Sequence, residues 1–229
     1  MTDPIKISAF EAGAPDWRVV SDGACAFYRT SSFAQSAAFI AELAELAEIA
    51  DLSEHQYGID LRQAGVTVRL VTQREDFMGM TDRDLELAQQ ISAVAQAQGL
   101  VSDPSRLQSI LIVPGAPDIK QVTPFWQAVL GYIPRPDSPD EDLVDPDDRG
   151  NAFWFETMDE PRPGGLGAIH LGLWMPLEEA KKRVDAALAA GGHLVRDDYA
   201  PAWWTLADAY GNEIDVSTSA YRDEPPPEN

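Results

Sequence analysis

The first residues suited to acid–base chemistry lie between Glu54 and Asp84. This segment contains His55-Gln56-Tyr57, then Thr72-Gln73, and then the run from Gly79 to Asp84. Histidine can protonate a leaving hydroxyl and can accept a proton elsewhere, because its reference pKa of about 6.5 lies near neutral pH. Glutamine makes hydrogen bonds but does not titrate. The segment therefore offers one titrating imidazole, His55, for acid–base chemistry.

Strand and helix patterns surround this segment and must position it. Residues 17–20 and 24–29 alternate as strands, and residues 58–61 and 66–72 read as two more. Ser32 and Gln35 have capping-box spacing at the start of a helix, and Thr81-x-x-Asp84 opens a second helix that Gly99 ends. The predicted order is strand, strand, helix, strand, strand, helix.

The segment resembles the active site of the pterin-4a-carbinolamine dehydratases. That family typically reads His-His-Pro, then a strand ending in Thr-His, then Gly-Leu-Thr-x-x-Asp. The resemblance covers roughly residues 17–98 and implies the dehydratase-like α+β fold. It makes His55 a catalytic residue and assigns substrate binding to Gln56, Gln73 and Asp84. Because glutamine replaces two of the three family histidines, and Tyr57 replaces the proline, the domain is expected to be degenerate.

The second half of the chain contains an internal repeat. A strand at 110–113 is followed by a helix expected to start at Pro124 and to end at Gly131, and a strand at 169–174 is followed by a helix between Pro176 and Gly191. Short strands follow each helix. Two copies of one strand, one helix and three strands indicate duplicated βαβββ modules.

Two stretches within this repeat, FWQAVLGY at 125–132 and LADAYGNEIDV at 206–216, resemble hallmark segments of the vicinal oxygen chelate superfamily. That superfamily includes glyoxalase I, extradiol dioxygenases and bleomycin- or fosfomycin-resistance proteins. The pairing of both halves resembles actinobacterial proteins that fuse a dehydratase-like domain to a glyoxalase-like one.

The predicted fold class is therefore α+β, with a dehydratase-like α/β sandwich followed by a vicinal-oxygen-chelate domain of two βαβββ modules. We expect an N-terminal lead-in at 1–16, the dehydratase-like domain at 17–98 and a linker at 99–106. The glyoxalase-like domain follows at 107–219, and a disordered tail at 220–229.

The second resemblance implies a cup whose metal ligands come from the first and last strands of each module. The nearest matches are His170, Glu156 and Asp215, with Gln108 or Ser109 in the first position. Such a set suits a divalent cation with open water positions. Only one imidazole is present, and Gly115 and Gly172 stand where acids are expected. We therefore predict that no cofactor is bound and that His170, Glu156 and Asp215 carry out acid–base chemistry. A bound divalent metal is the alternative.

Tryptophans are frequent in this half, and Trp154, Trp174, Trp203 and Trp204 are predicted to bind substrate. Successive residues of a strand face opposite sides, so one of Trp203 and Trp204 should face the cup and the other the covering helices. Likewise Trp154 and Glu156 should share a face. An aromatic wall of this kind can stack a planar ligand.

The net charge of −21, from 38 acids against 17 bases, argues against binding to nucleic acid or anionic membranes. No signal peptide or apolar stretch long enough to span a bilayer is evident, and the single Cys25 excludes an intrachain disulfide. A cytoplasmic protein that binds a small-molecule substrate is expected, and a homo-oligomer is compatible with the resemblance.

Four functions follow. The favoured one is a metal-independent lyase, isomerase or cyclase that acts on a small, largely apolar substrate, such as a secondary metabolite, in the glyoxalase-like cup. The alternatives are a 4a-hydroxytetrahydrobiopterin dehydratase that uses His55, a drug- or natural-product-binding resistance protein without catalysis, and a metal-dependent glyoxalase or dioxygenase.

Overall fold

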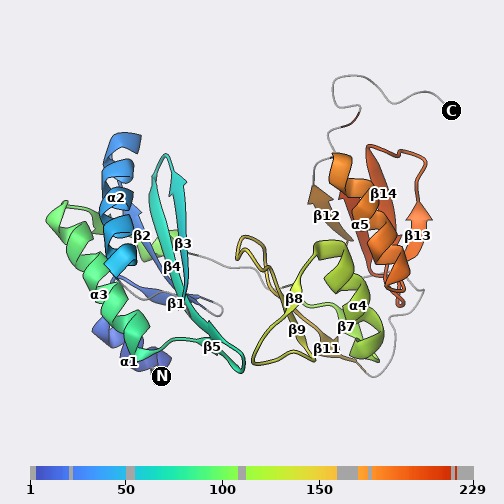
Figure 1. Cartoon of the computed structure of the whole chain (residues 1–229), viewed down its shortest axis with the longest axis horizontal. Helices are drawn as coiled ribbons and strands as arrows, with labels where there is room; N and C mark the ends of the chain where they lie inside the picture. The colour runs from blue at the N-terminus through green and yellow to red at the C-terminus, as the bar shows by residue number, and fades with distance from the viewer. Residues whose placement is uncertain are drawn as a thin grey trace. The chain divides into compact units, whose positions relative to one another are not determined.

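The structure is a computed structural model that describes residues 4–20, 23–49, 55–107, 112–158, 170–174, 177–217 and 220. The chain forms two compact units, unit 1 from Met1 to Ile110 and unit 2 from Leu111 to Asn229. Both units combine helices with antiparallel strand pairs, which confirms the α+β prediction (Figure 1). Gln108 and the predicted tail, apart from Ala220, lie outside the described residues.

Unit 1 is built on one antiparallel sheet. Its central order is β1 (Arg18–Val20), β2 (Gly23–Arg29), β4 (Gly65–Arg74) and β3 (His55–Arg62), with β5 (Phe77–Gly79) beside β4. Helices α2 (Phe33–Ile49) and α3 (Asp82–Ala97) lie along the sheet (Figure 1). Alternate residues of β4, namely Val66, Val68, Leu70 and Thr72, are fully buried.

Two segments that the sequence suggested to be connecting chain are structured in unit 1. Helix α1 (Ile7–Gly13) lies within the expected lead-in, and its Phe10 is fully buried. Strand β6 (Val101–Ser102) and a 3₁₀ turn at Pro104–Arg106 lie within the expected linker, and Ser102 pairs with Tyr28 of β2. Both segments are too short for their periodicity to indicate structure.

The start of α3 confirms the predicted helix opening at Thr81-x-x-Asp84. Thr81 is the N-cap, its side chain accepts from the Asp84 amide, and the Asp84 carboxylate accepts from the Thr81 amide at 2.7 Å. This reciprocal pair is a capping box, and it satisfies two backbone donors that the first helical turn leaves without partners.

Unit 2 contains the predicted duplication. The first module runs through β7 (Gly115–Ala116), α4 (Ile119–Leu130), β8 (Ile133–Pro134), β9 (Asp142–Val144), β10 (Phe153–Trp154) and β11 (Glu156–Thr157). The second runs through β12 (His170–Trp174), α5 (Leu177–Ala189), β13 (His193–Arg196), β14 (Trp203–Ala207) and β15 (Glu213–Ser217). In each module the first strand pairs in parallel with the last, and the remaining pairs are antiparallel.

The expected start of the first repeat helix at Pro124 is wrong. Helix α4 begins at Ile119, before Pro124, and its N-cap is Asp118, whose carboxylate accepts from the Lys120 amide at 3.1 Å. An Asx cap outweighs the usual preference for proline in the first turn. The predicted end is confirmed, since Gly131 has a left-handed φ of 72°.

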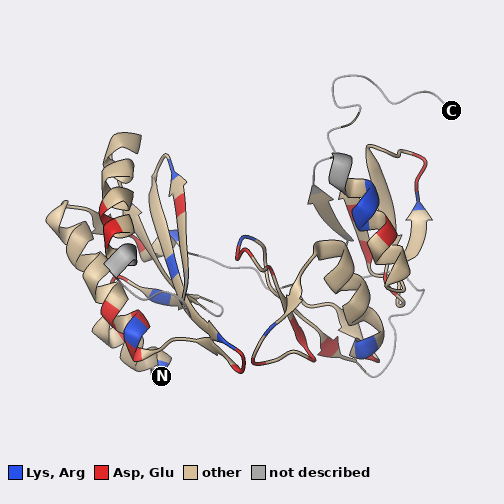
Figure 2. Ribbon diagram, viewed as in Figure 1, with Lys and Arg blue, Asp and Glu red and all other residues tan. Residues whose placement is uncertain are grey.

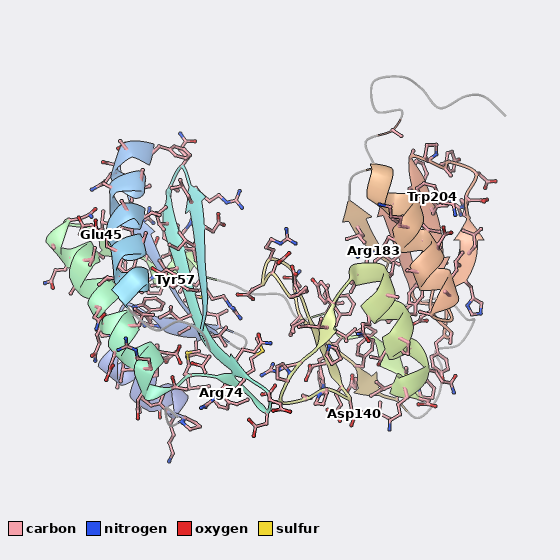
Figure 3. The ribbon with its side chains drawn as sticks, in the orientation of Figure 1. Glu45, Tyr57, Arg74, Asp140, Arg183 and Trp204 are labelled. Carbon is pink, nitrogen blue, oxygen red and sulfur yellow. The ribbon has the colours of Figure 1, made fainter. Side chains whose placement is uncertain are left out.

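The two modules of unit 2 share one apolar core. Phe125, Trp126 and Phe153 of the first module pack in one cluster with Val184 and Leu206 of the second. Two polar contacts reinforce it, from Trp126 Nε1 to Asp208 Oδ2 at 3.1 Å and from Arg183 to the Val129 carbonyl at 2.7 Å. Arg183 lies between α4 and α5 (Figure 3). The core faces of the sheets in both modules are therefore turned toward α4 and α5.

Acidic residues are spread over the helices and strands of both units (Figure 2). Among the described residues, no helix combines the length and apolar character needed to cross a membrane.

Candidate functional site

The register of β14 and β15 separates an apolar face from a polar one. Trp204 pairs with Val216 and Leu206 with Ile214, and these residues belong to the core cluster. Trp203 pairs with Ser217 and Thr205 with Asp215, so these four lie on the opposite face. The alternation predicted for the two tryptophans is thereby resolved, because Trp204 packs toward the helices and Trp203 faces away from them.

The Asp215 carboxylate on this polar face is held by a hydroxyl. Thr205 is 4% exposed, and its Oγ1 donates to Asp215 Oδ1 at 2.6 Å. Thr205 has a single hydroxyl proton, so this donation fixes Asp215 as the acceptor. The hydrogen bond therefore holds the Asp215 carboxylate in a defined orientation on this face.

An aromatic pair lies next to this carboxylate. The rings of Tyr199 and Trp203 stack with centroids 4.3 Å apart and an interplanar angle of 16°. Tyr199 is 40% exposed and Trp203 is half-buried. Trp203 and Asp215 lie diagonally opposite on one face of the antiparallel pair β14 and β15. Residues in this arrangement are roughly 7–8 Å apart. The stacked pair therefore offers a flat apolar surface within reach of an acid–base group.

The first module places a second set of side chains away from the core. Phe153 and Phe155 are buried in the cluster, so Trp154 and Glu156 lie on the opposite face, as the alternation predicts. Trp154 is half-buried and Glu156 is exposed. Glu156 pairs with Gly115, and the Met158 Sδ lies 2.9 Å from where a Cβ of Gly115 would be. Gly115, where the resemblance leads us to expect an acid, is thus lined by the thioether of Met158.

Asp142, which no sequence motif singled out, also lies on this face. It pairs with Trp154 across β9 and β10, whereas its neighbour Leu143 pairs with buried Phe153. Burial raises the pKa of the Asp142 carboxyl, while a hydrogen bond to Ser138 and the charge of Arg135 oppose the rise. A carboxyl with a raised pKa is suited to donate a proton. Its position in the acidic run from Asp140 to Asp148 hid this signal in the sequence.

In unit 1, the motif aspartate is used for structure. Asp84 is fully buried, and its Oδ2 accepts from Thr81 Oγ1 and Thr72 Oγ1, each at 2.6 Å, as well as from the Thr81 amide. It thereby ties the start of α3 to β4. Its assignment to substrate binding remains a prediction, since the carboxylate is shielded from solvent in this structure.

The other predicted residues of unit 1 lie on β3 and β4. The backbone pairs His55 with Thr72 and Gln56 with Val71, and the side chains of both residues lie outside the described part. Gln73 is half-buried and pairs with Met78. Tyr57, at the family's proline position, has a buried hydroxyl without a hydrogen-bond partner among the described residues (Figure 3). Burial raises the pKa of this phenol, so it stays protonated.

The described residues do not assemble the metal site that the second resemblance implies. His170 pairs with Glu213 through the backbone of β12, but its side chain and that of Trp174 lie outside the description, as does Gln108. Among the described residues, no group of three or more His, Cys, Asp or Glu side chains is placed to hold a metal ion. Glu156 and Asp215, as described, therefore do not form part of a recognisable ligand set.

Two family models match the chain. Residues 3–94 match pterin 4 alpha carbinolamine dehydratase, and residues 111–217 match a glyoxalase-like domain. A search of curated proteins gives no significant match.

Solved structures resemble parts of the chain at low identity. A glyoxalase-related enzyme from Fulvimarina pelagi is 21% identical, with 49% of this chain and 88% of its own covered and a TM-score of 0.37. A transcriptional coactivator/pterin dehydratase from Brucella melitensis is 22% identical, with 41% and 99% covered and a TM-score of 0.36. A bleomycin-binding protein from Streptomyces verticillus is 12% identical, with 49% and 97% covered and a TM-score of 0.34.

Proposed function

Because the chain joins a pterin-4a-carbinolamine dehydratase-like domain to a glyoxalase-like domain, we propose that it is an enzyme whose chemistry takes place on the polar sheet faces of unit 2. The substrate is a small, largely apolar and at least partly planar molecule. The reaction is of the lyase, isomerase or cyclase type and proceeds by proton transfer without a metal. The dehydratase-like unit is a degenerate member of its family.

One observation carries this proposal, namely the Asp215 carboxylate held by Thr205 beside the stacked Tyr199 and Trp203 rings. The ring pair offers a surface on which a planar substrate stacks, which holds the substrate near the carboxylate. Asp215 then takes a proton from the substrate, and Thr205 keeps the carboxylate oriented. Exclusion of water by the aromatic surface strengthens this contact.

The residues around the implied metal positions support a metal-free reaction. Gly172 pairs with Asp215 and contributes no side chain beside it, and Met158 fills the space at Gly115. Asp142, with its raised pKa, is the candidate to return a proton, and His170 and Glu156 are further acid–base candidates. Neutral and apolar groups thus line positions where a chelating site would carry charge.

The test begins with a fluorescence screen of planar apolar compounds against the wild type and Trp203→Phe, followed by turnover assays of each compound that binds. The proposal predicts binding that depends on Trp203 and turnover that is lost in Asp215→Asn. Stoichiometric binding without turnover would instead identify a sequestering protein. Elemental analysis covers the remaining alternative, because near-stoichiometric metal that is lost in both His170→Ala and Asp215→Ala would identify a metal-dependent glyoxalase or dioxygenase.

The match of residues 3–94 favours a second candidate, dehydration of a 4a-carbinolamine pterin with His55 as the acid–base residue. The capping box at Thr81 and Asp84, part of the family motif, is formed. The assay is pterin dehydration by the wild type and by His55→Ala. Activity that falls by about 10² or more in the variant would establish this function, and equal rates for both proteins would exclude it.

A further inference from the structure

Unit 1 has a cavity that no part of the proposed function uses. It has a volume of about 500 Å³ and lies between the loop after α1, the second half of α3 and β6. This volume is within the range of about 300–1,000 Å³ that is typical of small-molecule sites. The cavity lies away from Thr81 and Asp84, because its α3 residues run from Gln89 to Gln96.

A chain of hydrogen bonds with a fixed direction ends at the Asp16 carboxylate in this cavity. Trp17 Nε1 donates to Ser92 Oγ at 3.0 Å, and indole can only donate. The Ser92 hydroxyl lies 3.0 Å from the Tyr28 hydroxyl, which in turn donates to Asp16 Oδ2 at 3.3 Å. Because Tyr28 gives its only hydroxyl proton to Asp16, Ser92 is the donor between Ser92 and Tyr28. All donors therefore point toward the carboxylate.

Two further features leave this carboxylate with acceptor positions to spare. Burial raises the pKa of the fully buried Tyr28 phenol, so that it remains a donor. Ser102 Oγ donates to Asp16 Oδ1 at 2.8 Å. The hydrogen bonds from Tyr28 and Ser102 thus use two of the roughly four acceptor positions of a carboxylate. The remaining acceptor positions of the carboxylate face the cavity, which Asp16 itself lines.

No positively charged side chain lines the cavity, and the guanidinium of Arg18 donates to the carbonyl of Pro15 at 2.8 Å. Asp16 forms no ion pair among the described residues. Pro15, Ala93 and Leu100 provide apolar surface beside the carboxylate. One carboxylate and a few hydroxyls are too few oxygen ligands for Ca²⁺, which takes about 6–8. An ammonium group, with three donors and no acceptor, matches this set.

We propose that this cavity binds a small organic molecule that carries a protonated primary amine. The ammonium group is held by Asp16 and the neighbouring serine hydroxyls, and the carbon skeleton lies along Pro15, Ala93 and Leu100. The overall charge of −21 raises the local concentration of such cations.

The test is an amide-NMR titration of the full chain with 2-phenylethylammonium, with the neutral 2-phenylethanol as matched ligand. A salt concentration of about 0.15 M screens exposed charges beyond about 8 Å. We expect saturable shifts centred on Asp16, Ser92 and Ser102, with a dissociation constant below about 1 mM. The alcohol should bind at least about tenfold more weakly.

Three variants make the test specific. Asp16→Asn should weaken ammonium binding by about tenfold or more. Asp76→Asn removes the same charge from an exposed turn of unit 1 and should leave binding unchanged. Ala93→Leu adds bulk to the wall of the cavity at a side chain that makes no hydrogen bond and should weaken binding, so it serves if Asp16→Asn does not fold. Equal binding of ammonium and alcohol, equal binding by wild type and Ala93→Leu, or no saturation by about 1 mM would overturn the proposal.

Discussion

Thr205 and Asp215 face each other across β14 and β15, and the threonine hydroxyl donates to the aspartate carboxylate at 2.6 Å. Thr205→Val keeps the shape of the side chain but removes the donor. We expect the free energy of unfolding to fall by about 1 kcal/mol, and turnover of any substrate found in the screen to fall more than its binding. Urea unfolding and a comparison of kcat with KM measure the two effects. Thr205→Ser, which keeps the hydroxyl, should restore the rate, and an unchanged rate in Thr205→Val would show that the pair has no catalytic role.

The neighbouring tryptophans provide a second, internally controlled prediction. Trp204→Ala removes a core side chain and should cost about 2 kcal/mol in unfolding free energy. Trp203→Ala alters the opposite face and should cost less than about 1 kcal/mol while abolishing binding of planar ligands. Urea denaturation and fluorescence titration of both variants check this. A larger loss of stability in Trp203→Ala, with ligand binding lost only in Trp204→Ala, would contradict the described register.

Asp84 should be needed for the stability of unit 1. Asp84→Asn removes the charge that accepts from Thr81 and Thr72 and should lower the unfolding free energy by about 2 kcal/mol. Asp82→Asn, at an exposed position in the same helical turn, should change it by less than about 0.5 kcal/mol. Denaturant unfolding of both variants gives the comparison. Similar losses in the two would show that the capping box contributes little beyond helix-dipole charge.

Asp142 should make stability depend on pH. Because its folded-state pKa is raised above 3.8 by burial, the folded protein binds the proton more tightly than the unfolded chain does. This contribution to stability is present below pH 3.8 and is lost as the pH rises through the folded pKa. Asp142→Asn, which does not titrate, should therefore be more stable than the wild type at pH 7, with a difference that shrinks toward pH 3.8. Thermal unfolding of both proteins as a function of pH tests the sign, and a wild type that gains stability relative to the variant on going to pH 7 would contradict it.

The sequence predicts local features better than it predicts which face of an element is buried. The helix opening at Thr81 depends on residues three apart and was predicted correctly. The alternation of Trp203 and Trp204 was also predictable, but its direction depends on α5 packing against β15, which is a tertiary relationship. The predicted helix start at Pro124 is wrong because Asp118 caps the helix six residues earlier. Asp16, Tyr28, Ser92 and Ser102 are separated by long stretches of chain, and no spacing rule would group them.

The contact from Arg183 to the Val129 carbonyl has a consequence for any binding assay on unit 2. The last carbonyls of a helix lack partners within that helix, so α5 completes the end of α4, and both helices contribute to the same core cluster. Melting of either module exposes that core, and the two are therefore expected to melt together. A ligand held by only one sheet will raise the melting temperature of both modules, so a thermal-shift screen will detect occupancy without revealing which half of the duplicated domain holds the ligand.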